Sequence, residues 1–291
     1  MYDLKEKIYA LITLFKPSEQ NAEKIKYLSK YVDKVFLCDN SGENKGELFS
    51  EIENAIYINN QSNLGLSAAY NAALRDSKYG WNDNDFIIFF DQDSSVSQKH
   101  IEKLVHIYQK LERKMDKVGC LGPAYFNSAN GQVEVVKGKK IFDRTYEVNR
   151  IITSSMLIRY SILKDVGFFN DSVFLDYADW DLCWRLRKAG YSCFTTTATK
   201  IDHRVGLGEK KIGPLSIRIW DPIRTYYQVR DGKYLLRQGY IPAHDRMQLI
   251  YMTSVLPKLN IKYLDQSSER KKYYHKAIKD FNAGKIGAIE G

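Results

Sequence analysis

Two acidic side chains directly behind an apolar run are the residues whose types and spacing best suit chemistry. Asp91 and Asp93 flank Gln92 and follow five apolar residues, 86–90. Carboxylate oxygens are ligands that Mg²⁺ and Mn²⁺ accept, and one carboxylate of such a pair can instead bind a ribose hydroxyl. Two charges behind a buried strand are costly without a cation or hydrogen-bond donors. The alternative is that Asp93 or Ser94 only caps the next helix.

A second group of carboxylates, Asp176, Asp179 and Asp181, lies in the segment 174–191. Asp179 stands where an aromatic run becomes an amphipathic helix, so its charge could simply complement the helix dipole. It could equally act as a general base that removes a proton from an acceptor hydroxyl. Inversion at a sugar carbon needs one such base, whereas retention usually needs a carboxylate nucleophile as well.

Short polar residues follow other predicted strands. Residues 39–41, Asp-Asn-Ser, suit recognition of a base or ribose edge and are equally consistent with an Asx-turn. Asn63, Gly65 and Asn71 lie in a tight turn and a small-residue helix that a ligand or the sheet could approach closely. The imidazole of His203 could complete a metal shell, although a single histidine is more often structural.

The pattern of apolar residues predicts the elements that position these side chains. We predict strands over residues 7–14, 35–39, 55–59, 86–90 and 118–124, and helices over 18–31, 66–77 and 98–115. Strands separated by short helices imply an α/β fold, with a mostly parallel sheet and helices on both faces. Ligands of such sheets bind beyond the carboxyl ends of the strands, where each candidate motif lies.

The second half of the chain has a different pattern. Asn130-Gly131 is a hairpin turn signal, and residues 152–158 and 191–201 are predicted strands. Helices are predicted over 178–188, closed by Gly190, from Asp221-Pro222 to about residue 237, and over 267–281. We therefore expect a sheet-containing domain, residues 1–220, and a C-terminal helical region, residues 221–291.

Composition and charge indicate the class of protein. The 291 residues are 44% hydrophobic and 27% charged, as in ordinary soluble proteins, and no apolar run approaches the roughly 20 residues of a membrane span. The net charge of +9 comes from residue 204 onward, where 17 Lys or Arg accompany 8 Asp or Glu. This uneven charge argues against a uniformly nucleic-acid-coated protein. It predicts contact with an anionic membrane surface, with a homodimer surface or a solvated tail as alternatives.

The cysteines and the N-terminus predict the compartment. The N-terminus lacks the pattern of a signal peptide, and Cys38, Cys120, Cys183 and Cys193 are scattered without metal-ligand spacing. We expect four buried thiols in the reducing cytoplasm, in a protein that is peripheral at the inner face of the cell membrane.

Taken together, the motifs resemble those of glycosyltransferase family 2, the inverting enzymes of the GT-A fold. The matching residues run in order along the chain: DNS at 39–41, NLGLSAAYN at 63–71, FFDQDS at 89–94, GFFNDSVFLDYADWDLCWRLRKAGY at 167–191, DHRVG at 202–206 and RTYYQVRDGKYLLR at 224–237. A single motif is a weak signal, whereas this ordered set is specific.

The resemblance implies a role for each matching residue. Asp39 would contact the base or its ribose, and Asp179 would be the catalytic base. Donor contacts would come from Thr13, Phe15, Asp39, Asn63, Gly65, Asn71, Asp91, Gln92 and Asp93. The metal, Mn²⁺ or Mg²⁺, would be held by Asp93 and His203, with Asp91 as a further candidate. Acceptor contacts would come from Trp180, Asp181 and Arg204.

The wording of FFDQDS and LDYADWDLCWRLR is most similar to the bacterial rhamnosyltransferases of this family, which use dTDP-L-rhamnose to build polysaccharides on a lipid carrier. This resemblance implies transfer of L-rhamnose to a hydroxyl of a lipid-linked saccharide. The alternatives are another donor, such as a UDP-sugar, and a non-catalytic nucleotide-sugar-binding protein.

The chain departs from the family pattern at three places. Ala178 stands where many relatives have Glu, so Asp176 or Asp181 could take the role of the base. Asp231 stands where relatives often have Asn, and the usual glycine near residues 154–155 is absent. These departures concern the acceptor side of the site.

Overall fold

The strands at the centre of the fold are buried on both faces. A computed structural model describes residues 6–127, 132–133, 136–203, 208–212 and 215–290. In β1 (Ile8–Leu14), Tyr9 and Leu11 join the apolar cluster on one face, whereas Ala10 and Ile12 join the cluster on the other. β4 (Phe86–Asp91) alternates in the same way. A strand covered on both faces is a continuous apolar run, which is why these strands could be recognised in the sequence.

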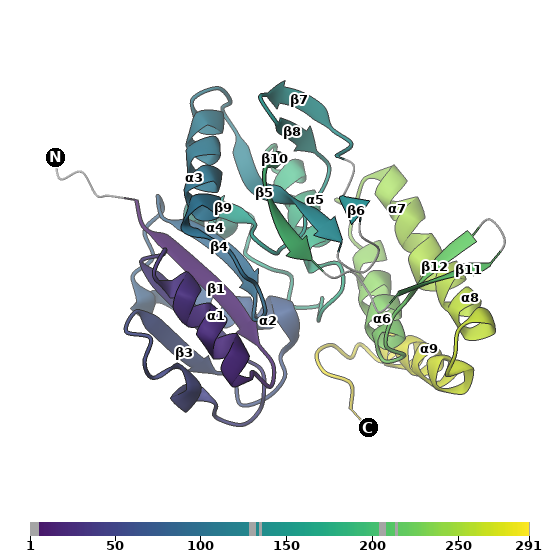
Figure 1. The fold of residues 1–291 in the computed structure, drawn as a ribbon. Coiled ribbons are helices and arrows are strands. Elements are labelled where there is room, and N and C mark those ends of the chain that lie inside the picture. The colour runs from purple at the N-terminus through teal and green to yellow at the C-terminus, as the bar shows by residue number, and fades with distance from the viewer. Residues whose placement is uncertain (1–5, 128–131, 134–135, 204–207, 213–214, 291) are drawn as a thin grey trace.

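Strands and helices alternate through the first half of the chain, and helices predominate at its end (Figure 1). The other strands are β2 (Lys34–Asp39), β3 (Ala55–Asn59), β5 (Val118–Asn127), β6 (Gln132–Val133), β7 (Lys139–Phe142), β8 (Thr145–Val148), β9 (Leu157–Arg159), β10 (Ser192–His203), β11 (Gly208–Ile212) and β12 (Leu215–Ile219). The helices are α1 (Glu19–Ser29), α2 (Gly65–Leu74), α3 (Gln98–Glu112), α4 (Tyr160–Asp165), α5 (Ala178–Lys188), α6 (Arg224–Leu236), α7 (Ala243–Ile250), α8 (Leu256–Tyr263) and α9 (Ser267–Asn282), with short turns η1 (Gly46–Phe49), η2 (Ser77–Tyr79) and η3 (Tyr251–Val255).

The main sheet has the strand order β3-β2-β1-β4-β9-β5-β10-β8-β7. Strands β3, β2, β1 and β4 are parallel, β9 is antiparallel to both β4 and β5, and β10 is parallel to β5. The carboxyl ends of β1, β2, β4, β5 and β10 therefore lie along one edge of the sheet. This arrangement confirms the predicted α/β fold and brings the candidate motifs to that edge.

Helices cover both faces of the sheet. Ile25 of α1 and Leu104 of α3 belong to the apolar cluster on one face, and Ala69 of α2 and Leu182 of α5 belong to the cluster on the other. Ser18 caps α1 through a reciprocal pair of hydrogen bonds with Asn21, as a polar residue at this position predicts.

The predicted strand over residues 152–158 is wrong for most of its length. Only Leu157 onward forms β9, because Ser155 has a φ of +61° and Met156 N bonds back to Thr153 O at 2.9 Å. The Ser155 hydroxyl lies 3.1 Å from Nε2 of His100, whose pKa is lowered to about 4 by burial. A neutral histidine thus supports the left-handed turn at Ser155.

Two other predictions concern chain segments near turns. The helix expected from Asp221-Pro222 begins at Arg224, and Asp221 accepts a hydrogen bond from Ile223 N at 3.1 Å. The hairpin turn expected at Asn130-Gly131 lies outside the described residues.

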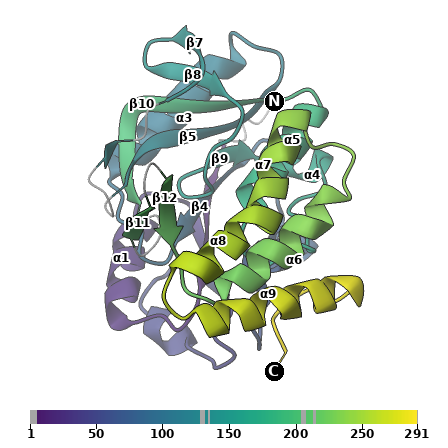
Figure 2. The same cartoon turned by 90° about the vertical axis from the view of Figure 1, so that its right-hand side faces the viewer.

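The C-terminal helices pack against the loop that precedes α5 (Figure 2). Tyr227 of α6 stacks on Phe174 with ring centroids 4.3 Å apart, and Asp231 accepts a hydrogen bond from Phe174 N at 2.8 Å. The indole of Trp184 donates to Asp245 of α7 at 2.8 Å. Among the described residues, no helix is both long and apolar enough to cross a membrane.

Candidate active site

The ends of three neighbouring parallel strands carry two predicted site carboxylates along the same edge of the sheet. Thr13 of β1 pairs with Asp91 of β4, and the next residue, Leu14, pairs with Asp39 of β2. The Thr13 side chain bonds to the hydroxyl of buried Tyr70. Burial, reinforced by the charge of Asp91, raises the pKa of Tyr70 well above its usual value. The carboxylate of Asp91 is therefore close enough to Tyr70 to act on its hydroxyl.

The loop after β4 is fastened to the end of β1 through Gln92. Its side-chain oxygen accepts from Phe15 N at 2.8 Å, and its amide donates to Phe15 O at 3.3 Å. Gln92 thus positions the loop, and its predicted contact with the donor stays a prediction. Asp91 is partly buried and Asp93 is exposed, while the ring of Phe15 is 48% exposed at the same edge. Two carboxylates at this edge form an oxygen donor set of the kind that hard divalent cations prefer.

Asp39 is completely buried and anchors the loop after β2. One carboxylate oxygen accepts from Ser41 N at 2.8 Å and Ser41 Oγ at 2.5 Å, and the other accepts from the Tyr57 hydroxyl at 2.5 Å. Burial, together with the bond to Asp39, raises the pKa of Tyr57 to about 12. The Asx-turn expected as an alternative is present here. Asp39 already has three donors within the protein, so it fixes the loop that faces the sheet edge.

Gly65 begins α2 where another part of the chain approaches very closely. Its φ is +80°, and a Cβ atom there would lie 2.3 Å from Phe174 O. Leu66 N donates to the same carbonyl at 2.6 Å, and Asn63 Oδ1 accepts from Gly65 N at 3.0 Å. The glycine is therefore needed for contact with the segment that carries the second group of carboxylates.

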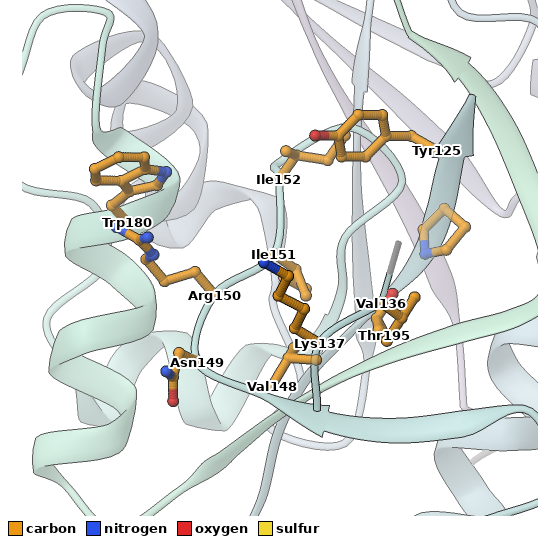
Figure 3. Close-up of a pocket in the computed structure, with 11 residues that line it drawn as sticks. Tyr125, Val136, Lys137, Val148, Asn149, Arg150, Ile151, Ile152, Trp180 and Thr195 are labelled. Atoms are coloured by element: carbon orange, nitrogen blue, oxygen red, sulfur yellow. The ribbon is translucent and has the colours of Figure 1, made fainter. Parts of the chain in front are cut away.

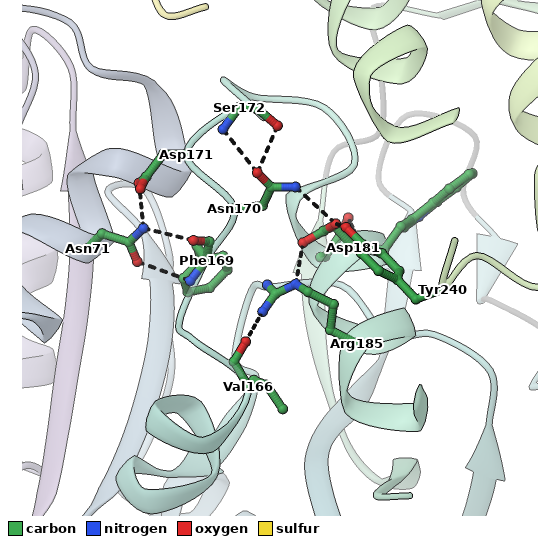
Figure 4. Close-up of polar contacts among 11 residues, drawn as sticks. Asn71, Val166, Phe169, Asn170, Asp171, Ser172, Asp181, Arg185 and Tyr240 are labelled. Carbon is green, nitrogen blue, oxygen red and sulfur yellow. Dashed lines mark hydrogen bonds and ion pairs between the residues drawn. The ribbon is translucent and has the colours of Figure 1, made fainter. Parts of the chain in front are cut away.

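Asn71, which was expected among the donor contacts, instead holds a loop in the interior (Figure 4). It is 3% exposed; its amide donates to Phe169 O at 2.9 Å and to Asp171 at 2.6 Å, and its oxygen accepts from Phe169 N at 3.0 Å. All of its hydrogen-bonding groups are used in joining α2 to the segment before α5.

Asp179 is the second residue of α5. The helix begins directly after Tyr177, which has a φ of +71°. The carboxylate is partly buried and accepts from Trp180 N at 2.8 Å. Burial raises its pKa to about 7, and the nearby Cys183 and Asp176 act in the same direction. A carboxyl with a pKa near neutrality can accept a proton in a reaction and release it afterwards.

The two neighbouring aspartates are engaged elsewhere. Asp181, expected to meet the acceptor, is completely buried; it accepts from Arg185 at 2.7 Å, from Asn170 at 3.3 Å and from the Tyr240 hydroxyl (Figure 4). Asp176, the other alternative for the base, pairs with the guanidinium of Arg224. Asp181 therefore belongs to the packing of α5, and Asp176 is held by an ion pair.

A cavity of about 490 Å³ lies beside the start of α5 (Figure 3). Trp180 lines it together with Arg150, Tyr125 and Lys137. The guanidinium of Arg150 stacks on the Trp180 ring at 3.7 Å and also donates to Gln248 at 2.9 Å. Arg150 had no signal in the sequence, because a single arginine in a loop says nothing about the distant helix that it contacts.

The structure describes the backbone of His203 but not its side chain, and it does not describe Arg204. His203 ends β10, where its Cα pairs with that of Asn127 in β5, so its backbone lies at the edge that carries the ends of β1 and β4. The side chain of His203 and the whole of Arg204 lie outside the described residues.

Known proteins share this arrangement. Residues 23–167 match glycosyl transferase family 2. The chain is 26% identical over 258 residues to the dTDP-rhamnosyl transferase RfbF of Shigella flexneri. The alignment covers 82% of this chain and 83% of that protein.

Two solved structures have a similar fold. GalNAc-T7 with UDP, GalNAc and Mn²⁺ superposes with a TM-score of 0.57 at 11% identity, over 90% of this chain and 59% of that one. The mannosyltransferase PcManGT of Pyrobaculum calidifontis, in complex with GDP-Man and Mn²⁺, superposes with a TM-score of 0.56 at 13% identity, over 97% and 76% of the two chains. Together with the sheet order, these similarities lead to one assignment: residues 23–167 form a glycosyltransferase family 2 domain, and the chain has the GT-A fold and is a glycosyltransferase.

Proposed function

We propose that this glycosyltransferase moves L-rhamnose from dTDP-L-rhamnose to a hydroxyl of a lipid-linked saccharide, with inversion at the anomeric carbon. The proposed role of catalytic base rests on one observation: the pKa of Asp179 is raised to about 7, and this residue lies at the start of α5 next to a tryptophan that lines a cavity. The choice of donor is supported by the Shigella relative, which is named a dTDP-rhamnosyl transferase.

The proposed chemistry is a single displacement. The acceptor hydroxyl gives its proton to a carboxylate oxygen of Asp179 while the acceptor oxygen forms a bond to the anomeric carbon. The bond between that carbon and the diphosphate breaks, and dTDP leaves with the electron pair. Attack from the side opposite the leaving group inverts the anomeric carbon, so the ionised Asp179 is the one base that the reaction needs.

We place the divalent cation, Mn²⁺ or Mg²⁺, at Asp93 and His203, with Asp91 as a further candidate. The described carboxylates fit such a site, because Asp91 ends β4 at the sheet edge, Asp93 follows it, and Gln92 holds their loop against β1. When bound, the cation would offset the charge that develops on the leaving diphosphate. Two structures of similar fold hold Mn²⁺, which supports the use of a divalent cation.

We place the acceptor in the cavity beside α5. Trp180 offers a flat apolar ring to a sugar, and it directly follows Asp179 in the same helical turn. Lys137 and Asn149 supply polar groups to the same cavity (Figure 3). A saccharide stacked on Trp180 would bring a hydroxyl within reach of Asp179.

We propose that α7, η3 and α8 form the surface that rests on the membrane. Met247, Ile250, Tyr251 and Val255 are 68%, 40%, 39% and 45% exposed. Their spacing of three, four and eight residues from Met247 places them on one helical face, which we call the apolar stripe. The exposed Lys258 and Lys262 continue this face along α8. An apolar stripe followed by basic residues suits the interface of an anionic bilayer, where a lipid-linked acceptor resides.

The donor assignment is tested by thermal unfolding of the purified chain with a panel of nucleotide-sugars and Mn²⁺. A ligand present at about 100 times its Kd should stabilise the folded state by about 2.7 kcal/mol. We expect dTDP-L-rhamnose to raise the unfolding temperature more than UDP-glucose or GDP-mannose, with a smaller effect when Mn²⁺ is chelated. Equal or greater stabilisation by a UDP-sugar would contradict the choice of donor and leave the reaction type intact.

A further inference from the structure

Three cysteines that are far apart in the sequence meet in the interior. Cys120 of β5, Cys183 of α5 and Cys193 of β10 have their sulfur atoms within 4.8 Å of one another. All three side chains are completely buried and free of disulfides. We call them the thiol cluster. The expectation of buried thiols is confirmed, but the chain spacing gave no sign that three of the four converge.

The sheet register and the packing of α5 explain why they converge. Cys193 and Cys120 are direct partners in the parallel pairing of β10 with β5, so their side chains stand next to each other on one face. Helix α5 covers that face and contributes Cys183 along with Leu182 and Leu186 (Figure 1). Cys183 donates weakly to Ile151 O at 3.9 Å, and Cys193 donates to Cys183 O at 4.0 Å. The sulfurs therefore stay close to one another rather than turning to solvent.

The separation of the sulfurs is close to what a shared ion requires. Two thiolates bound to one centre at about 2.3 Å each lie roughly 3.4 to 4 Å apart, for bond angles from about 95° to 120°. The thiol cluster needs to contract by roughly 1 Å to reach that spacing, which is within the range of side-chain rotation. Soft ions prefer thiolate ligands, so the class of ligand is a thiophilic element.

The number of ligands and the net charge of the site narrow the choice of bound element further. Among the described residues, no fourth His, Cys or carboxylate joins the three sulfurs, whereas structural zinc takes four ligands. Three thiolates carry three negative charges, and uncompensated charge is very costly at a completely buried position. A trivalent centre with three bonds to sulfur leaves the site neutral. A divalent or monovalent ion would leave net negative charge in the core.

We propose that Cys120, Cys183 and Cys193 form a three-thiolate binding site for one trivalent arsenic atom, taken up as arsenous acid. Three As–O bonds break and three As–S bonds form, and each thiol proton leaves with a hydroxyl group as water. Arsenic stays trivalent and no thiol is oxidised, so the step needs no oxidant or reductant. Entry requires α5 to separate locally from β5 and β10, which makes loading slow relative to exposed thiols.

The test uses the reduced full-length chain, incubated with arsenite and then freed of unbound arsenic by gel filtration. We expect one arsenic atom per chain by elemental mass spectrometry. Cys120→Ala, Cys183→Ala and Cys193→Ala should each lose the bound arsenic. Cys38→Ala is the matched control, because Cys38 is also completely buried but stands outside the thiol cluster, and it should retain the full amount.

X-ray absorption at the arsenic edge of the loaded wild-type chain gives a result that does not depend on how the variants fold. We expect three sulfur neighbours and no oxygen neighbour around arsenic. Any of three results would overturn the proposal: no arsenic retained by the wild-type chain, equal retention in folded Cys183→Ala, or a spectrum with oxygen in the first coordination shell. A Cd²⁺ titration adds an independent check, since the charge argument predicts weaker binding of Cd²⁺ than of arsenite.

Discussion

Asp179 has the two properties that a general base needs at neutral pH. It is placed by a fixed element, because its carboxylate accepts from Trp180 N within the first turn of α5. Its pKa is raised to about 7, chiefly by burial. An ordinary aspartate, with a pKa near 4, would be ionised but only weakly basic. The environment of Asp179, rather than its residue type, therefore suits it to the role of base.

Replacing the base by its neutral isostere should separate activity from stability. We expect Asp179→Asn to lower kcat by on the order of 10² to 10⁴-fold while donor binding is kept. In the wild-type chain, kcat/KM should fall about tenfold per pH unit below pH 7, because the base is then protonated. Above pH 7 the variant should unfold at a higher temperature than the wild type, since a buried charge is removed. Donor-dependent transfer rates and thermal unfolding across pH 5–9 would measure these effects.

Asp176→Asn is the matched control for that experiment. Asp176 forms an ion pair with Arg224 and lies in the same segment, so its replacement tests the alternative alignment of the base. Near-normal turnover in Asp179→Asn, with loss of turnover in Asp176→Asn, would transfer the role of the base to Asp176.

Polar residues at single positions could be recognised in the sequence, but their partners could not. Asp39, Asn71 and Asp181 were each expected to contact a substrate from their residue type and motif. The structure gives each of them hydrogen bonds within the protein, from Tyr57, Phe169 and Arg185 respectively. A sequence shows which groups need a partner, whereas the fold decides whether that partner is a ligand or another residue.

Elements that are defined by local chemistry were predicted within a few residues. The runs at 55–59 and 178–188 coincide with β3 and α5, and Ser18 caps α1 as expected. The failure at 152–158 has a tertiary cause. Its apolar and β-branched residues are typical of a strand, but His100 from α3 and Phe89 O from β4 hold Ser155 in a turn. Contacts from other elements override local preference at this position.

The junction between α2 and the segment before α5 depends on one glycine. Gly65→Ala would place a Cβ atom 2.3 Å from Phe174 O at a φ of +80°. We expect a loss of at least about 3 kcal/mol in the free energy of unfolding and weaker donor binding, because the turn at the sheet edge must shift. Denaturant unfolding and nucleotide titration would measure the two effects.

Gly80→Ala is the control that measures only the cost of placing alanine at a positive φ. Gly80 also has a positive φ, +65°, but a Cβ atom there would meet nothing within 4 Å. Its replacement should cost only about 1 kcal/mol and leave donor binding unchanged. Equal losses in the two variants would mean that close approach to Phe174 does not matter.

Across the whole molecule, α5 connects the parts of the proposed site. Its first turn carries Asp179 and Trp180, and its buried face contributes Cys183 to the thiol cluster. Arg150 joins Trp180 to α7 through Gln248, and Trp184 reaches Asp245 of the same helix. The 220/221 division expected from the sequence remains a prediction, and the contacts show that the C-terminal helices pack directly on α5.

Contacts between side chains of distant elements could not be predicted from the sequence. Cys120 and Cys193 become neighbours only through the register of β5 and β10, although more than 70 residues separate them in the sequence. The approach of Arg150 to Trp180 likewise needs the whole sheet to be in place. Pattern analysis detects periodicity within an element but carries no information about which side chains of distant elements meet.

The apolar stripe leads to a prediction about the whole molecule. We expect the chain to bind phosphatidylglycerol vesicles in flotation assays and to bind phosphatidylcholine vesicles more weakly, because basic residues follow the stripe on α8. Replacing Met247, Ile250 and Val255 together by Gln should abolish most of this binding, since each side chain would otherwise bury apolar area in the bilayer interface.

The matched control replaces Tyr27 and Ile286, which are 50% and 54% exposed but lie outside the stripe, and it should bind as the wild type does. Transfer to a soluble saccharide should stay unchanged in the stripe variant, because Asp179 and the cavity are untouched. If vesicle binding persists while a wild-type dimer becomes monomeric in the stripe variant, the stripe is a surface between two copies of the chain and the membrane assignment is wrong.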